Sequence, residues 1–265
     1  MKLNASALCL FLVLLGTTVR ATAQEQGQSR SGQERRSFFL IGNSLTWDTV
    51  PSQLVGDTQW HVDCGKSLPY MVANPDEPCV KSSTLWPGAL EQKKYEVLAI
   101  QVHYGSTLEE DVTAISKLIQ QQPEARVVIH TGWARSASRA EEWASVQRSP
   151  AASMSHGPAW FDSLLKALRR KHPDRTFERT RAMDLLQQVE RDIAAGQAPI
   201  ADVADLYRDK IHMDVASGRY LMHNAMRHAL GQPRSSRGFE KLTPDMKRWL
   251  DSVLDRVLGE SPGSE

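Results

Sequence analysis

The stretch Phe38-Phe39-Leu40-Ile41-Gly42-Asn43-Ser44-Leu45-Thr46 decides how this chain is interpreted. Four consecutive apolar residues are typical of a buried parallel β-strand. The glycine that follows permits a tight turn. Ser44 would then lie just beyond the carboxyl end of the strand, exposed on a rigid support, as a nucleophile requires. Turns use glycine and serine routinely, so this motif alone is weak evidence for catalysis.

Strand-like runs alternate with amphipathic segments along the rest of the chain. The further strands are expected at residues 59–64, 95–102 and 125–130, and the helices at 108–121, 158–168, 183–195 and 216–230. A last helix begins at Thr243-Pro244, an N-cap residue followed by proline at the first helical position. Such alternation predicts an α/β fold, a three-layer α/β/α sandwich with a parallel sheet covered on both faces.

In parallel sheets of this kind, functional sites form beyond the carboxyl ends of the strands. Four segments follow a predicted strand in this way: Gly42-Asn43-Ser44, Gly65, the residues after Val102, and Thr131-Gly132. We therefore expect these four segments to converge on one edge of the sheet.

The N-terminus has the pattern of a secretory signal peptide over residues 1–23. Lys2 precedes an apolar run at residues 7–15, and Ala21-Thr22-Ala23 forms a small-x-small cleavage site. An uncleaved anchor is the alternative. Residues 24–36 are polar and are expected to be a disordered lead-in, 37–258 the folded domain, and 259–265 a flexible tail. The expected location is secreted or periplasmic, with no stable membrane insertion after cleavage.

The charge balance does not favour a nucleic-acid partner. The chain has 32 basic and 31 acidic residues, a net charge of +1. Basic residues gather between Arg135 and Arg181. A solvated helix face is the simpler interpretation of this cluster, and a surface that attracts an anionic substrate is the alternative.

Two cysteines, Cys64 and Cys79, remain after removal of the signal peptide. In an oxidising compartment such a pair is more often a disulfide than a metal site. Two cysteines without a nearby histidine pair make a poor zinc site, and we predict no metal.

The second informative motif is Asp209-Lys210-Ile211-His212. An aspartate three residues before a histidine can bring its carboxylate to the imidazole Nδ1. That interaction fixes the tautomer and leaves Nε2 free for a serine hydroxyl. Ser44, His212 and Asp209 together supply a nucleophile, a base and a carboxylate that orients the base.

Both motifs resemble those of the SGNH, or GDSL, hydrolases. Residues 39–46 resemble the Gly-Asn-Ser variant of the family's N-terminal block, and residues 206–212 resemble its C-terminal Asp-x-x-His block. The resemblance implies a flavodoxin-like fold with Ser44 as nucleophile, His212 as general base and Asp209 as its orienting residue. It implies no cofactor. Only these two ends of the resemblance are specific.

The resemblance also implies donors for an oxyanion hole. Gly65 stands where the family has a glycine whose backbone N–H is a donor, and the N–H of Ser44 is a second. The family's third donor is an asparagine after the third strand, which this chain lacks. Gln101 is the expected substitute because its amide can donate, and His103 is the next candidate. A Cys64–Cys79 disulfide would brace the loop that contains Gly65.

These features predict an exported serine carboxylester hydrolase whose substrate is a small-molecule or carbohydrate ester. Deacetylation of carbohydrates is the favoured case, because Trp47, Trp133 and Trp160 could stack on a sugar. Tryptophans are nevertheless more often core residues.

Two other classes remain open. One is a catalytically weak SGNH-like module that binds a carbohydrate or another ligand, which the missing asparagine supports. The other is an α/β-hydrolase, which also has the order Ser, Asp, His. Its nucleophile elbow requires a glycine where this chain has Thr46, so it is disfavoured.

Overall fold

The structure is a computed structural model that describes residues 36–147 and 149–259. The predicted signal peptide, residues 24–35 of the predicted lead-in and residues 260–265 of the predicted tail lie outside the described residues. Arg36, assigned to the lead-in, is described. Its side chain donates hydrogen bonds to Glu96 and to the Gly231 carbonyl.

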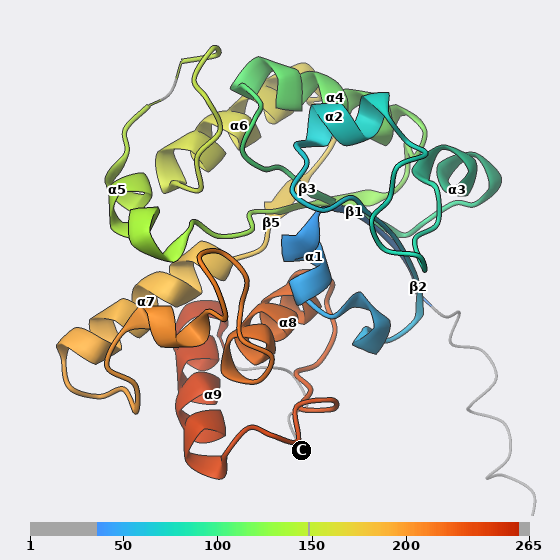
Figure 1. The fold of residues 1–265 in the computed structure, drawn as a ribbon. Coiled ribbons are helices and arrows are strands. Elements are labelled where there is room, and N and C mark those ends of the chain that lie inside the picture. The colour runs from blue at the N-terminus through green and yellow to red at the C-terminus, as the bar shows by residue number, and fades with distance from the viewer. Residues whose placement is uncertain (1–35, 148, 260–265) are drawn as a thin grey trace, which may run out of the picture. The chain divides into compact units, whose positions relative to one another are not determined.

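Within the described residues the strands form one five-stranded sheet, in the order β2-β1-β3-β4-β5 (Figure 1). All neighbouring strands pair in parallel. The strands are β1 (Ser37–Gly42), β2 (Asp57–Val62), β3 (Val97–Gln101), β4 (Arg126–His130) and β5 (Phe177–Arg179).

Helices cover both faces of this sheet, as predicted (Figure 1). One face packs against α2 (Leu68–Ala73), α3 (Trp86–Gln92), α4 (Leu108–Gln120) and α6 (Pro158–Lys171). The other lies beside α1 (Ser44–Asp48), α7 (Ala182–Ala194), α8 (Ser217–Ala229) and α9 (Pro244–Leu258). A short helix, α5 (Arg139–Ala144), and the 3-10 turns Pro51–Gln53, Ser136–Ser138 and Val203–Leu206 complete the elements.

Alternate side chains of a strand point to opposite faces of the sheet, so the apolar run in β1 packs against both helical layers. In β1, Phe39 and Ile41 belong to the core cluster beneath α4 and α6, whereas Phe38 and Leu40 pack with residues of α8. Successive side chains of a strand point to opposite faces, so a strand buried on both sides has no polar positions. The α/β prediction is confirmed.

The four strands and five helices expected from the sequence are present, with ends shifted by up to three residues. The sequence analysis did not predict β5, a three-residue edge strand, or the short helices α1, α2, α3 and α5. Strands and helices of this length have too few residues to show a period.

Cys64 and Cys79 form the predicted disulfide, with their Cα atoms 5.6 Å apart. The backbone N–H of Cys79 also donates to the carbonyl of Val62, at 3.0 Å, so the segment after α2 returns to the end of β2.

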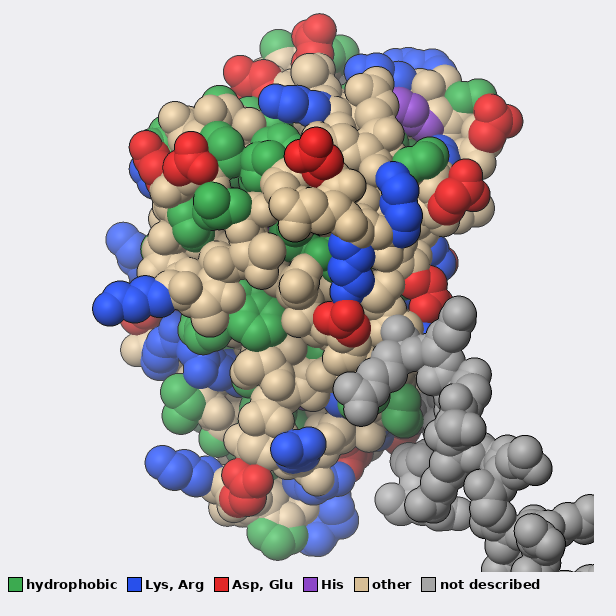
Figure 2. Space-filling model, turned by 90° about the vertical axis from the view of Figure 1, so that its right-hand side faces the viewer, with side chains coloured by type: hydrophobic (Ala, Val, Ile, Leu, Met, Phe, Trp, Pro, Cys, Tyr) green, Lys and Arg blue, Asp and Glu red, His purple; other side chains and the backbone are tan. Residues whose placement is uncertain are grey.

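Two further observations concern the surface and the membrane. Basic and acidic side chains are interspersed on the face seen in Figure 2. In the part of the chain that the structure describes, no helix is long and apolar enough to cross a membrane.

Removing the disulfide should destabilise the domain. We expect the Cys64→Ser/Cys79→Ser variant to lose roughly 3 kcal/mol of unfolding free energy, because the crosslink closes a loop of 15 residues in the unfolded chain. Urea unfolding followed by tryptophan fluorescence measures this loss. Wild type treated with a reductant is the matched control, and an unchanged unfolding midpoint in both samples would contradict the expectation.

Candidate active site

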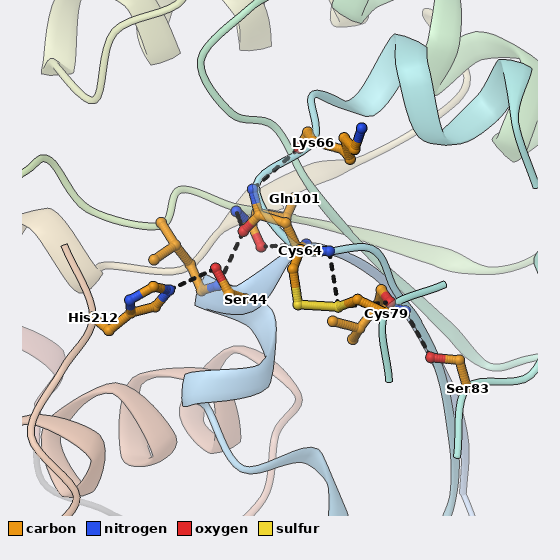
Figure 3. The surroundings of a disulfide bond; sticks show 10 residues. Ser44, Cys64, Lys66, Cys79, Ser83, Gln101 and His212 are labelled. Atoms are coloured by element: carbon orange, nitrogen blue, oxygen red, sulfur yellow. Dashed lines mark hydrogen bonds between the residues drawn. A yellow bond between two sulfur atoms is a disulfide. The ribbon is translucent and has the colours of Figure 1, made fainter. Parts of the chain in front are cut away.

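The turn that presents Ser44 is held by a buried glutamine from the neighbouring strand. Gln101 Oε1 accepts from the backbone N–H groups of Asn43 (3.1 Å) and Thr46 (2.9 Å) and from the Thr46 hydroxyl (2.6 Å). Gln101 Nε2 donates to Asn43 Oδ1 at 2.7 Å, and that oxygen also caps α1 by accepting from the Leu45 N–H. One amide therefore organises the start of the helix, and Figure 3 shows it directed at the turn.

Gly42 is required by this close approach. A Cβ atom at this position would lie 2.1 Å from Thr46 Oγ1 and 2.6 Å from Gln101 Oε1. Both contacts are shorter than any real Cβ contact, so a larger residue would displace the glutamine from the turn.

Ser44, His212 and Asp209 form a continuous hydrogen-bonded chain. Ser44 Oγ lies 2.9 Å from His212 Nε2 (Figure 3), although 168 residues separate them in sequence. His212 Nδ1 lies 2.8 Å from Asp209 Oδ2. The backbone N–H groups of Ile211 and His212 donate to Asp209 Oδ1 at 2.9 and 2.8 Å and hold the carboxylate in place. The structure thus brings together the three residues selected from the sequence.

Several groups act on the Asp209 carboxyl. Desolvation raises its pKa, but the backbone N–H groups of His212 and Ile211 and the His212 imidazole lower it more, to about 2. The carboxylate is therefore charged throughout the neutral range. It favours an N–H at Nδ1 of His212 and leaves Nε2 to accept the serine proton.

A buried aspartate that the sequence analysis missed joins the two halves of this site. Asp48, in α1, is fully buried and accepts from the guanidinium groups of Arg208 (3.0 Å) and Arg219 (2.7 Å). Its second oxygen accepts from the backbone N–H of Met213 at 2.9 Å. Arg208 and Met213 flank the Asp209–His212 motif, so this carboxylate ties the helix of the nucleophile to the loop of the base.

The segment after β4 supports the same loop from its other side. The Trp133 indole donates to the Ile211 carbonyl at 2.6 Å, and the Ser136 N–H donates to the Lys210 carbonyl at 3.0 Å. The Tyr207 hydroxyl donates to the Ala134 carbonyl at 3.1 Å.

Two of the three tryptophans that were suggested to stack on a sugar are buried. Trp133 is 0% exposed and Trp160 is 2% exposed, so both are core residues. Trp47 is partly exposed and packs against Trp60, with ring centroids 6.1 Å apart.

The backbone N–H groups of Gly65 and Ser44 were expected to donate to an oxyanion. Gly65 has a φ of +71° in the loop after β2, and that loop is joined to the nucleophile turn by a hydrogen bond from Asn43 Nδ2 to the Lys66 carbonyl. Among the described residues, no acceptor is found for the backbone N–H of Gly65 or Ser44. Both N–H groups therefore remain candidates for the expected role.

Gln101 is placed differently from the sequence-based expectation. It is 0% exposed, and its amide is occupied by Asn43 and Thr46. The side chain therefore has a structural role within the turn.

His103 lies near His212, but its hydrogen bonds fix the wrong tautomer for an oxyanion donor. His156 Nδ1 lies 2.7 Å from the Thr131 carbonyl, which only accepts, so this nitrogen carries the proton. Burial lowers the pKa of His156 to about 3, so the ring is neutral and its Nε2 is an acceptor.

The tautomer of His156 determines that of His103. His103 Nδ1 lies 3.3 Å from His156 Nε2 and must donate to it. Burial, with the nearby charge of Arg135, lowers the pKa of His103 to about 3, so this ring is neutral as well. Its Nε2 then holds a lone pair. In this tautomer Nε2 of His103, for which the described residues provide no partner, is an acceptor, which differs from the expected role of His103 as an oxyanion donor.

Comparisons with known proteins give structural likenesses only. No family model matches the sequence, and no curated protein matches it. A GDSL-like lipase from Parabacteroides merdae has a TM-score of 0.44 and 15% identity, over 75% of this chain and 96% of that one. A carbohydrate esterase family 3 protein from Talaromyces cellulolyticus has a TM-score of 0.39 and 11% identity, over 74% and 96%. At such scores the likenesses assign neither a family nor an activity to this chain.

Replacing Asp48 should affect both stability and the site. We expect Asp48→Asn to cost about 3 kcal/mol, the low end for breaking a buried ion pair, because both arginines retain some contact with solvent. The unfolding midpoint in urea measures the loss. The control is Asp245→Asn, which breaks an exposed ion pair with Arg248 and should change stability by less than about 0.5 kcal/mol. Equal losses in the two variants would contradict the role of Asp48.

The tautomers of the histidine pair can be observed directly. We expect nitrogen-15 NMR at neutral pH to show His103 and His156 both neutral and both protonated at Nδ1. The His156→Phe variant removes the acceptor and should release His103 to populate the Nε2–H form. An Nε2–H signal from His103 in the wild type would refute this assignment.

Proposed function

We propose that this protein is an SGNH-type serine carboxylester hydrolase that acts outside the cytoplasm. The observation that carries the proposal is the hydrogen-bonded chain from Ser44 through His212 to Asp209, with links of 2.9 and 2.8 Å. These are the distances at which a base can take a proton from a hydroxyl and a carboxylate can orient that base.

The reaction proceeds in two halves. Ser44 Oγ attacks the ester carbonyl as His212 Nε2 takes its proton, and the imidazolium then protonates the departing alcohol. Water, activated by the same imidazole, attacks the acyl-enzyme and releases the acid and free Ser44. In each half the backbone N–H groups of Ser44 and Gly65 hold the negative oxygen.

A catalytically weak binding module is the second candidate, and one observation favours it. Gln101 is occupied in the turn and His103 is an acceptor, so neither supplies a third oxyanion donor. Loss of one such donor costs ~10²–10³ in rate in a serine hydrolase. The intact Ser44–His212–Asp209 chain favours turnover over binding alone.

The Cys64–Cys79 disulfide supports a location in an oxidising compartment, which agrees with the signal peptide expected at residues 1–23. The proposed substrate is a small-molecule or carbohydrate ester. With Trp133 and Trp160 in the core, preference for a sugar would have to come from Trp47 or from polar groups around Ser44.

An activated serine can be detected without knowing the substrate. We expect a fluorophosphonate probe to label the purified protein at Ser44, because His212 makes this hydroxyl nucleophilic. Labelling should disappear in Ser44→Ala and persist in Ser82→Ala, which removes an exposed serine elsewhere. Gel fluorescence and mass spectrometry of the labelled peptide provide the readout.

Two results would count against the hydrolase. Labelling that persists in Ser44→Ala would place the reactive group elsewhere. A folded wild type that takes up no probe would instead favour the binding module.

A further inference from the structure

Arg135 is an exposed cation beside the candidate active site whose partners leave its charge unpaired. Its guanidinium lies over the ring of Tyr104, 4.7 Å from the ring centroid. Among the described residues it forms no ion pair and donates no side-chain hydrogen bond to a carboxylate. An aromatic face under a guanidinium fixes its position without neutralising it.

The platform beneath Arg135 is itself fixed. The Tyr104 hydroxyl donates to Glu142 Oε1 at 2.6 Å, and its ring packs against His103 and His156, with centroids 4.8 Å away in each case. Glu142 is the acid of this cluster. Its oxygens already accept from Tyr104, from the Ser138 hydroxyl and from the His156 N–H, and none accepts from Arg135.

The backbone around Arg135 is bonded to the loop of the proposed base. Ser136, the next residue, donates to the Lys210 carbonyl, and Trp133 donates to that of Ile211. The Tyr104 ring that lies under Arg135 also packs against the His103 ring, with centroids 4.8 Å apart. Arg135 therefore shares one aromatic neighbour with His103, and the residue after it is bonded to the loop that contains His212.

The neighbouring polar group complements this cation. The free Nε2 of His103 is an acceptor, as derived above, and suits a substrate hydroxyl. The guanidinium of Arg135 is a planar donor that suits a carboxylate or sulfate. An apolar or neutral acyl chain would use neither group.

We propose that Arg135 and His103 form a specificity subsite that selects esters carrying an anionic group and a hydroxyl, as in an O-acylated acidic sugar. The inference rests on the proposed hydrolase function and names the substrate class of that same site. It also gives a role to Arg135, the first residue of the basic segment between Arg135 and Arg181.

The test compares two sugars that differ only at C6, where one carries a charge and the other does not. Monoacetylated methyl glucuronoside carries a carboxylate where monoacetylated methyl glucoside carries a hydroxymethyl group, and acetate release gives kcat/KM for each. We expect wild type to prefer the glucuronoside and Arg135→Gln to lose about tenfold of that preference, which corresponds to about 1.4 kcal/mol. Added salt should reduce the wild-type preference, because it screens an exposed charge.

Arg170→Gln is the matched control. Arg170 is exposed near the end of α6, and its neighbour Arg169 donates to the Phe177 carbonyl at the amino-terminal end of β5. This variant removes the same charge near the amino-terminal ends of the strands, away from the candidate site at their carboxyl ends. It should keep the wild-type preference. An equal loss in Arg170→Gln would indicate a general charge effect and overturn the subsite.

Hydrolysis of 4-nitrophenyl acetate separates the two proposals. If Arg135→Gln hydrolyses this neutral ester as wild type does while losing the preference for the glucuronoside, both proposals stand. The subsite fails and the hydrolase stands if wild type hydrolyses 4-nitrophenyl acetate but does not prefer the glucuronoside. The same conclusion follows if Arg135→Gln retains that preference. If wild type hydrolyses no ester, the proposed function fails and the subsite with it.

Discussion

The carboxylate of Asp48 is the constraint on which the geometry of the site depends. It is fully buried, and burial of an unpaired charge costs several kcal/mol. Four hydrogen-bond donors offset that cost, and they come from two arginines and from the backbone at Met213. Because Asp48 belongs to the helix of Ser44 and Met213 follows His212, the distance between hydroxyl and imidazole is set by contacts to one small group.

A second constraint acts from the adjacent strand, through the side chain that was expected to be the third oxyanion donor. Gln101 stabilises the turn at Asn43 and Thr46 only because Gly42 has no Cβ to obstruct it. The amide oxygen and one N–H of Gln101 are thus used within the turn. The turn in this chain gains rigidity from the side chain that the sequence suggested for catalysis.

The sequence was a good guide wherever a pattern is local. Continuous apolar runs predicted β1, β3 and β4, and the spacing of Asp209 and His212 predicted their contact, because both depend on neighbouring residues. The contact between Ser44 and His212 was expected only through the resemblance to a family. The role of Asp48 was not predictable, since one aspartate in a five-residue helix shows no periodicity, and its partners follow 160 residues later.

The histidine pair illustrates a limit of another kind. Whether His103 donates or accepts depends on which of its nitrogens carries the proton. The Thr131 carbonyl determines the tautomer of His156, and the Nε2 of His156 then determines the tautomer of His103. This assignment requires both rings to be neutral, and burial lowers the pKa of each ring enough to keep it neutral. The resemblance in sequence suggested a donor side chain after β3. Whether the side chain there donates or accepts follows only from residues on other segments, and in this structure those residues assign His103 Nε2 as an acceptor.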